Sequence, residues 1–306
     1  MVVTFTDRRC LGHDPIDFPE RPARLAEILA GLGTAGAEVR ESGEHPRTLA
    51  AIEAVHDPRY VARFRRAVER GDGLLDSADN PLTGKTWDAA LAAAAVALSA
   101  ADWMMEGDGR RAFAAVRPPG HHAERAMAMG FCYFNNVAVA AQHLRDRHGV
   151  ERVAIFDFDV HHGNGTQHLF EERADVFFAS THQYPFYPGT GAAGEQGRGR
   201  GESFTLNVPL PAGTADASYQ VALEERVLPA IRGFRPQVLL VSAGFDAWQG
   251  DPLGGLRLTE ASFERLGREL GALADELCGG RVLSLLEGGY DLTSLPRLVT
   301  TYLESL

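Results

Sequence analysis

The chain has 306 residues, of which 45% are hydrophobic, and its formal net charge is −11. This apolar fraction excludes intrinsic disorder, and three cysteines are too few for a disulfide scaffold. Nucleic-acid-binding proteins usually carry a basic excess, whereas here 41 acidic residues outnumber 30 basic ones. The N-terminus shows no basic segment followed by an apolar one, so we expect no secretory signal and a cytoplasmic protein.

Short runs rich in aliphatic and β-branched residues recur along the chain, and most are continuously apolar, which is typical of a parallel sheet buried on both faces. The expected strands are 2–5, 112–116, 153–156, 176–179, 204–208, 238–241 and 282–286. The expected helices are 22–32, 58–69, 86–105, 136–147, 217–232, 260–277 and 294–306. This alternation predicts an α/β fold with an open parallel sheet in a single domain over residues 1–306.

Two segments need a separate interpretation. The most apolar helical stretch, 87–105, is mostly alanine and carries Asp88, Ser99 and Asp102. A membrane span needs about 20 strongly apolar residues, so we expect a buried helix of a soluble protein here. The glycine-rich stretch 189–201 lies between two expected strands, and we expect a long loop on the side of the active site.

Residues that bind metals or transfer protons follow five of the expected strands directly. These segments are 117–122, 157–165, 180–182, 242–246 and 287–290. In open α/β sheets, ligands bind beyond the carboxyl ends of the strands. The sequence therefore predicts one active site at that edge of the sheet.

The segment after the strand 153–156 has the pattern of a metal site. Asp157, Asp159 and His161 alternate, and alternate side chains of an extended segment share one face. Asp159 and His161 can therefore bind one ion with Asp157 behind them, and Asp246 is the candidate third ligand. Two carboxylates and one imidazole leave room for water, as a catalytic divalent ion requires, and Fe²⁺ is an alternative to Zn²⁺. The alternative interpretation is an Asp/His group that holds a loop by hydrogen bonds.

Candidate proton carriers lie at two other strand ends. His121 and His122 follow two prolines and a glycine, and adjacent histidines with different partners can act as base, acid or charge stabiliser. Tyr290, after two glycines, can donate a hydrogen bond to a carbonyl oxygen that gains negative charge.

Six motifs, taken together, resemble a known family. They are RPPGHH (117–122), GFCYFNN (130–136), DFDVHHGNG (157–165), YPGTG (187–191), AGFDA (243–247) and EGGY (287–290). Their types and order are similar to those of the zinc-dependent histone deacetylase superfamily, which includes bacterial deacetylases and acetylpolyamine amidohydrolases. Asn164, where class I enzymes carry Asp, makes the chain more similar to the class II branch. The resemblance implies an arginase-like fold with an eight-stranded parallel sheet.

The resemblance also implies a reaction, in which an acetyl or related acyl group is removed from the side-chain amine of acyl-lysine. It implies that His122 acts as general base and then as general acid, and that Asn164 orients it. It implies that His121, paired with Asp157, stays cationic, and that Tyr290 holds the oxyanion.

The cations implied by the resemblance are Zn²⁺ and K⁺. Zn²⁺ is expected on Asp159, His161 and Asp246. A structural K⁺ is expected near Asp157, Asp159, His161, Ser180 and Thr181, and a second monovalent ion near Phe170, Arg173 and Val176.

The resemblance further implies a narrow tunnel for the substrate. Phe131 and Tyr187 form its walls, and the Gly130 carbonyl accepts the amide proton of the substrate. Asp79 is a candidate acid at the rim. Polyamine-selective relatives carry an acidic residue seven positions after the Asp metal ligand, where this chain has Leu253, so acyl-lysine is favoured over acetylpolyamines.

Two smaller expectations complete the site. Arg21 resembles a family arginine that steadies the region of product release, and Cys132 is expected to be a small buried thiol.

Four alternatives stay open. One is a deacetylase for acetylpolyamines or other small acyl-amines. Another is a ureohydrolase with two Mn²⁺ ions, although the residues 162–164 offer no bridging carboxylate. The others are a deacylase for longer acyl chains and a degenerate member that only binds acylated ligands.

Overall fold

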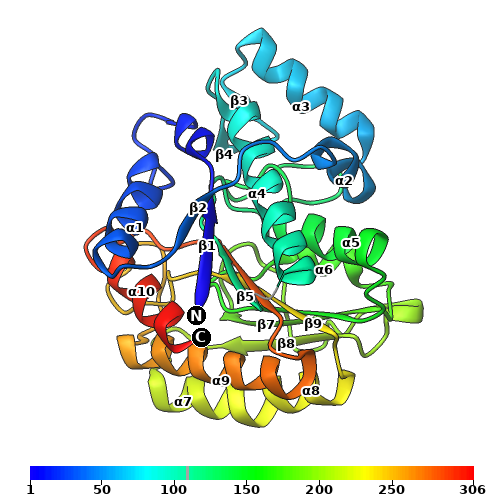
Figure 1. Ribbon diagram of the computed structural model, residues 1–306, viewed down its shortest axis with the longest axis vertical. Coiled ribbons are helices and arrows are strands. Elements are labelled where there is room, and N and C mark those ends of the chain that lie inside the picture. The colour runs from blue at the N-terminus through cyan, green and yellow to red at the C-terminus, as the bar shows by residue number, and fades with distance from the viewer. Residues whose placement is uncertain (108–109) are drawn as a thin grey trace.

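The computed structural model describes residues 1–107 and 110–306. Its main sheet has eight strands in the order β2-β1-β5-β10-β9-β6-β7-β8, and every neighbouring pair is parallel (Figure 1). The strands are β1 Val2–Thr6, β2 Val39–Glu41, β5 Arg111–Ala114, β6 Val153–Asp157, β7 Val176–Gln183, β8 Thr205–Leu210, β9 Val238–Ala243 and β10 Val282–Leu286. A short antiparallel pair, β3 Leu74–Leu75 and β4 Ser77–Pro81, lies outside this sheet. The predicted arginase-like α/β fold is confirmed.

Helices cover both faces of the sheet. Figure 1 shows α4 and α5 on one face and α8 and α9 on the other. The helices are α1 Pro22–Thr34, α2 Thr48–Val55, α3 Pro58–Arg70, α4 Thr86–Glu106, α5 Asn136–His148, α6 Asn164–Phe170, α7 Asp216–Ala222, α8 Leu228–Phe234, α9 Glu260–Cys278 and α10 Leu295–Ser305. The main sheet takes strands from both ends of the chain. That residues 1–306 form a single domain stays a prediction.

The apolar helix α4 is a core element. Its length and composition would suit a membrane span, yet 67% of its most apolar window is buried inside the protein. Ala92, Ala94 and Ala97 are completely buried. Small side chains let a helix lie close to its neighbours, which explains why alanine dominates this segment.

The structure differs from the expected elements in several places. β2 was not expected because Val39–Glu41 is exposed and has one apolar residue. Helices α2 and α6 were also not expected, and α6 begins within the motif 157–165. The helix expected over 217–232 is interrupted by a π-helical turn, Leu223–Val227, just before Pro229. Proline has no N–H for the regular helical hydrogen bond, which accounts for the wider turn.

The strand order explains how distant segments meet. β5, β10, β9, β6 and β7 are consecutive in the sheet and parallel, so the loops after them leave from the same edge. Asp157, the last residue of β6, is level with Ser180 on β7 and with Ser242 on β9. The side chains predicted for the active site are therefore brought together by the register of the central strands.

Candidate active site

A cavity of about 330 Å³ opens at the carboxyl ends of the central strands. Its lining residues are Asp79, Pro119, His121, His122, Gly130, Phe131, His161, Phe186, Tyr187, Leu253, Gly288 and Tyr290. Nine of these were candidates from the sequence. Phe186 was not, although it stacks on His161 with ring centroids 5.3 Å apart. Its position beside Tyr187 was the available signal.

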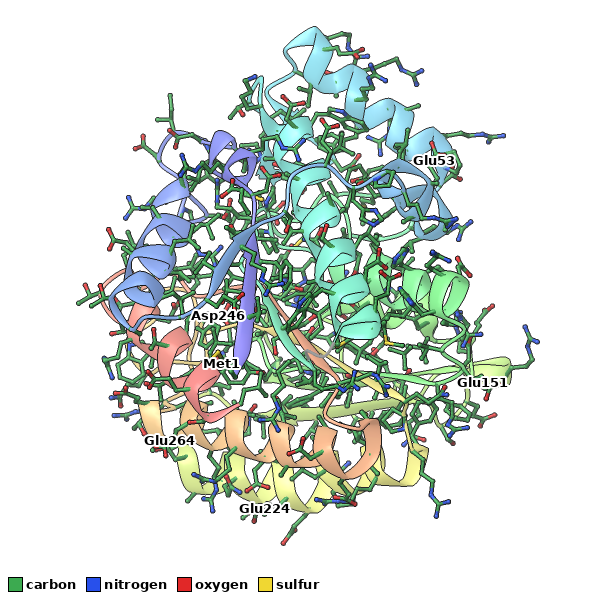
Figure 2. All side chains as sticks on the ribbon, in the orientation of Figure 1. Met1, Glu53, Glu151, Glu224, Asp246 and Glu264 are labelled. Carbon is green, nitrogen blue, oxygen red and sulfur yellow. The ribbon has the colours of Figure 1, made fainter. Side chains whose placement is uncertain are left out.

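Asp159, His161 and Asp246 form the candidate metal centre. His161 Nδ1 lies 3.1 Å from Asp159 Oδ1 and 3.1 Å from Asp246 Oδ2, and the donor atoms of all three lie within 4.8 Å of one another. Both carboxylates are fully buried, and Figure 2 places Asp246 inside the molecule while Glu224 and Glu264 lie at its surface. Two buried carboxylates close together repel each other, which is the arrangement that a bound cation relieves.

The backbone around these carboxylates leaves no room for side chains. A Cβ atom at Gly288 would lie 2.1 Å from Asp246 Oδ2, and one at Gly244 would lie 2.1 Å from Asp159 Oδ2. The Gly288 amide donates to Asp159 Oδ2 at 2.8 Å, and the Val160 amide donates to Asp246 Oδ1 at 2.9 Å. The ligands are thus held in place by backbone amides, and the residues present fit a divalent cation.

The two adjacent histidines have different partners. His121 Nδ1 lies 2.9 Å from Asp157 Oδ2. Burial alone would lower the pKa of His121, but Asp157 and Asp159 outweigh it and raise the pKa to about 10. Burial, together with the charge on His121, holds the pKa of His122 well below its usual value. One histidine is therefore cationic at neutral pH and its neighbour is neutral.

Asn164, at the first turn of α6, fixes the tautomer of His122. The Asn164 amide nitrogen donates to Glu124 Oε1 at 2.5 Å, so its oxygen faces His122 Nδ1 at 2.7 Å. Nδ1 then carries the proton, and Nε2 keeps the lone pair that a base needs. Glu124 also lies 2.8 Å from His168 Nδ1. The sequence did not single out Glu124, because its role depends on a contact 40 residues away.

Tyr290 is held by two residues that the sequence did not single out. Asp251 accepts the Tyr290 amide at 2.6 Å and also the amide of Leu253 at 2.9 Å. The guanidinium of Arg24 lies 4.6 Å from the ring centroid of Tyr290 and donates to Gly289 O at 2.6 Å. Burial raises the pKa of Tyr290 well above its usual value, so the hydroxyl stays protonated.

Arg24 corrects the expectation for Arg21. Arg21 is exposed before the first turn of α1, whereas Arg24 is completely buried and reaches the loop that carries Tyr290. Glu20 accepts a bond from Arg24 at 3.1 Å and two bonds from Arg117 at 2.8 and 2.7 Å. A buried ion-pair network therefore supports one side of the cavity.

Aromatic side chains form the walls of the cavity. Phe131 lies 6.0 Å from Tyr290, and Tyr187 lies 5.2 Å from His122, measured between ring centroids. Asp79 lies at the rim, where its Oδ2 accepts from Tyr187 Oη at 2.8 Å and from the Gly130 amide at 3.1 Å. Gly130 and Phe131 both have positive φ, at 56° and 66°. The left-handed turn at Phe131 is one that a large side chain adopts only where its surroundings hold it.

Ser180 and Thr181, the remaining K⁺ candidates, are buried beside β6. His182 Nε2 lies 2.8 Å from Gly191 O and therefore carries the proton, so its Nδ1 accepts from Ser180 Oγ at 2.9 Å. Ser180 Oγ keeps its lone pairs for another partner. Thr181 Oγ1 is paired with Tyr219 Oη at 2.9 Å.

The second monovalent site falls in the segment between α6 and β7. Phe170 O already accepts the Arg173 amide there at 2.9 Å. Cys132 is buried, as expected.

Comparisons with known proteins agree with this fold. A family model described as the histone deacetylase domain matches residues 18–306. The chain is 40% identical to histone deacetylase 14, chloroplastic, of Arabidopsis thaliana over 97% of this chain and 74% of that protein. It is 39% identical to a histone deacetylase-like amidohydrolase of Pseudomonas aeruginosa over 96% and 77%. The chain belongs to the histone deacetylase family.

A solved structure has the same fold. The acetylpolyamine aminohydrolase of Burkholderia pseudomallei superposes with a TM-score of 0.91 at 33% identity, covering 100% of this chain and 98% of that one. The likeness extends over the whole sheet and the segments at its carboxyl edge.

Proposed function

We propose that this hydrolytic deacetylase uses Zn²⁺ to remove acetyl groups from the side-chain amine of acetyl-lysine in peptides or proteins. One observation carries the proposal: a ligand triad of two carboxylates and one imidazole lies beside a cavity with aromatic walls and two buried histidines. An acetylated lysine has a thin apolar stem and a polar amide tip, so aromatic walls suit the stem and a metal suits the tip.

The metal is held by Asp159, His161 and Asp246, with Zn²⁺ proposed and Fe²⁺ as the alternative. When bound, it supplies Lewis-acid chemistry that polarises a carbonyl and makes a water molecule more acidic. The K⁺ proposed near Asp157, Ser180 and Thr181 would be structural, and the free lone pairs of Ser180 Oγ support it.

The chain's own residues then divide the proton chemistry. His122 Nε2 accepts a proton from the attacking water and later gives a proton to the leaving amine. His121, cationic through Asp157, stabilises negative charge as it develops, and Tyr290 donates its hydroxyl proton in a hydrogen bond to the carbonyl oxygen. The Gly130 carbonyl is proposed to accept the amide N–H of the substrate, while Phe131 and Tyr187 exclude water around the stem.

The test is acetate release from an acetyl-lysine peptide by the metal-replete protein, compared with the His122→Ala variant. We expect release that a chelator abolishes and that falls by at least ~100-fold in the variant. No release from protein that holds metal, together with no effect of the substitution, would contradict the proposal. A panel with longer acyl-lysines would reveal a different acyl preference.

A second function, deacetylation of acetylpolyamines, is supported by the likeness to the acetylpolyamine aminohydrolase structure. Against it, the position expected to bind a distant ammonium is Leu253, which lines the cavity and offers no charge. Leu253→Glu should shift the preference towards acetylated polyamines, measured as a ratio of kcat/KM values. A ratio that does not move would refute the role of this position, and Leu253→Gln is the uncharged control.

The location of the enzyme and the effect of its net charge are also proposals. We propose a cytoplasmic enzyme, in keeping with three cysteines that are all unpaired and buried. The net charge of −11 would attract cationic peptides or amines, a long-range effect that salt weakens.

A further inference from the structure

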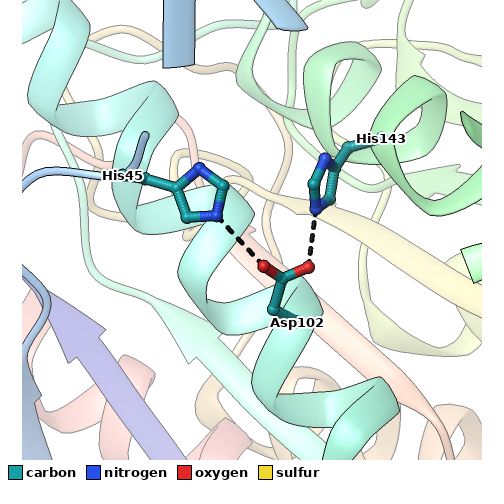
Figure 3. A group of neighbouring side chains, drawn as sticks. All are labelled: His45, Asp102 and His143. Atoms are coloured by element: carbon teal, nitrogen blue, oxygen red, sulfur yellow. Dashed lines mark hydrogen bonds and ion pairs between the residues drawn. The ribbon is translucent and has the colours of Figure 1, made fainter. Parts of the chain in front are cut away.

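Three histidines converge on one carboxylate where α4 and α5 end. Asp102 belongs to the last turns of α4, His143 and His148 to α5, and His45 to the segment between β2 and α2. The Nε2 atoms of His143 and His148 lie 2.6 and 2.7 Å from Asp102 Oδ1, and His45 Nε2 lies 3.0 Å from Oδ2. Figure 3 shows His45 and His143 pointing at the carboxylate from opposite sides. None of these residues lines the catalytic cavity.

The cluster is enclosed but open on one side. The side chains of His143, His148 and His45 are 3%, 9% and 10% exposed, whereas Asp102 is 25% exposed. Glu106 follows Asp102 by one helical turn, and its carboxylate lies within 4.8 Å of donor atoms of Asp102 and His148. An ion could therefore reach Asp102 from solvent, with the imidazoles of His45 and His143 on its other side.

The electrostatics of this place favour a cation. Hydrogen bonds from the three histidines outweigh the effect of burial and lower the pKa of Asp102, so the carboxylate is ionised. α4 ends at Glu106 and α5 ends at His148, so the negative ends of two helix dipoles lie at the cluster. Arg145, also on α5, is paired with Asp175.

We propose that Asp102, His143 and His45 form a second metal site, which takes a divalent late transition metal and Zn²⁺ first. Imidazole nitrogens with a carboxylate oxygen suit Zn²⁺, Ni²⁺ or Cu²⁺, whereas Mg²⁺ and Ca²⁺ prefer sites built from oxygen alone. Metal–nitrogen bonds of about 2.0–2.1 Å place tetrahedral ligand atoms about 3.3 Å apart. The donor atoms of His45, Asp102 and His143 all lie within 4.8 Å of one another, and the two Nε2 atoms lie 3.0 and 2.6 Å from the carboxylate oxygens. The carboxylate and the two imidazoles must shift to close around an ion.

Binding replaces the protons that now lie between nitrogen and oxygen. Each neutral imidazole moves its proton from Nε2 to Nδ1, and a charged imidazole releases one proton. At His45 this shift breaks one weak hydrogen bond, in which the Arg47 amide donates to Nδ1 at 3.3 Å. The ion would join three separate segments, so its role is to fix the segment before α2 against α4 and α5. This inference is independent of the proposed reaction.

Metal analysis of purified protein tests the site. Asp246→Ala removes one ligand of the catalytic centre, so zinc that remains after dialysis reports the second site. We expect two zinc ions per chain in the unchanged protein, one in Asp246→Ala and none in Asp246→Ala combined with Asp102→Asn. Asp246→Ala combined with His143→Gln should lose zinc too. Asp246→Ala combined with His168→Gln, a histidine outside the cluster, should keep one zinc ion.

Two further measurements separate metal binding from structural damage. Cu²⁺ bound to the Asp246→Ala variant should give an electron paramagnetic resonance signal with nitrogen hyperfine splitting, and that signal should vanish with Asp102→Asn. Added zinc should raise the unfolding temperature of Asp246→Ala but not of the double variant, with circular dichroism confirming that both are folded. An Asp246→Ala protein that holds no zinc, or a folded Asp102→Asn double variant that still holds one ion, would overturn the proposal.

Discussion

The Glu20→Gln substitution is expected to destabilise the protein strongly. Glu20 is 1% exposed and pairs with Arg117 and Arg24, both of which are completely buried. Glutamine has the same shape, but it removes the charge that compensates two buried guanidinium groups. Breaking a buried pair from one side typically costs about 3 to 5 kcal/mol of the free energy of unfolding.

The pKa of Glu20 gives a second, similar value for the loss of stability. Burial alone would raise this pKa, but Arg117 and Arg24 outweigh it and lower the pKa from 4.5 to about 2. A shift of that size corresponds to about 3 kcal/mol of stability. Because the folded-state pKa is the lower one, this contribution is complete above about pH 5. It is lost as the pH falls towards 2.

Urea unfolding at pH 7 measures the loss of the free energy of unfolding directly. A series of such measurements at different pH values shows whether this loss shrinks or grows in acid. The difference between the unchanged protein and Glu20→Gln should be constant from pH 8 to 6 and should shrink below about pH 5. Glu69→Gln is the matched control, since the Arg65–Glu69 pair is exposed and should contribute about 0.5 kcal/mol or less. A loss below about 1 kcal/mol for Glu20→Gln, or a difference that grows in acid, would refute the reasoning.

Three further predictions concern the cavity. Tyr290→Phe should lower kcat by about 100-fold or more with metal content unchanged, and an unaltered kcat would exclude an oxyanion contact. Gly288→Ala should abolish catalytic metal binding without unfolding the protein, because the new Cβ would lie 2.1 Å from Asp246 Oδ2. Competition with a chelating dye measures the affinity for the metal, and an affinity equal to that of the unchanged protein would contradict the prediction. Glu124→Gln should weaken the hydrogen bond that orients Asn164 and should lower kcat/KM. The fall should be smaller than the ~100-fold that loss of the base itself costs. A larger fall would assign Glu124 a direct part in the reaction.

Much of the site could be predicted because its residues directly follow buried strands. Asp157 ends β6, and Asp159 and His161 lie two and four residues further along. Local patterns of this kind are visible in a sequence. β2 was missed because an edge strand with two charged residues of three has no apolar signal, although it is paired with β1.

The residues that support the site depend on distant contacts, which a local pattern does not contain. The charge of Glu20 is paired in part by Arg117, 97 positions later in the chain. Arg24 is a case where the signal existed. It lies one residue before Leu25 and four before Ile28, both completely buried on α1, so the helical period places it on the inner face. Arg21 precedes the helix and has no such constraint.

The strand order has a consequence for folding. β9 and β10 are the last strands to be synthesised, yet they lie in the middle of the sheet, between β5 and β6. Until they emerge, the chain has two separate groups, β2-β1-β5 and β6-β7-β8, each with an unpaired edge facing the gap. Such edges are templates for aggregation, and pairing across so many residues is slow. Asp246 and Tyr290 arrive with these strands, so assembly of the sheet and completion of the active site are one event, and a truncated chain would have neither.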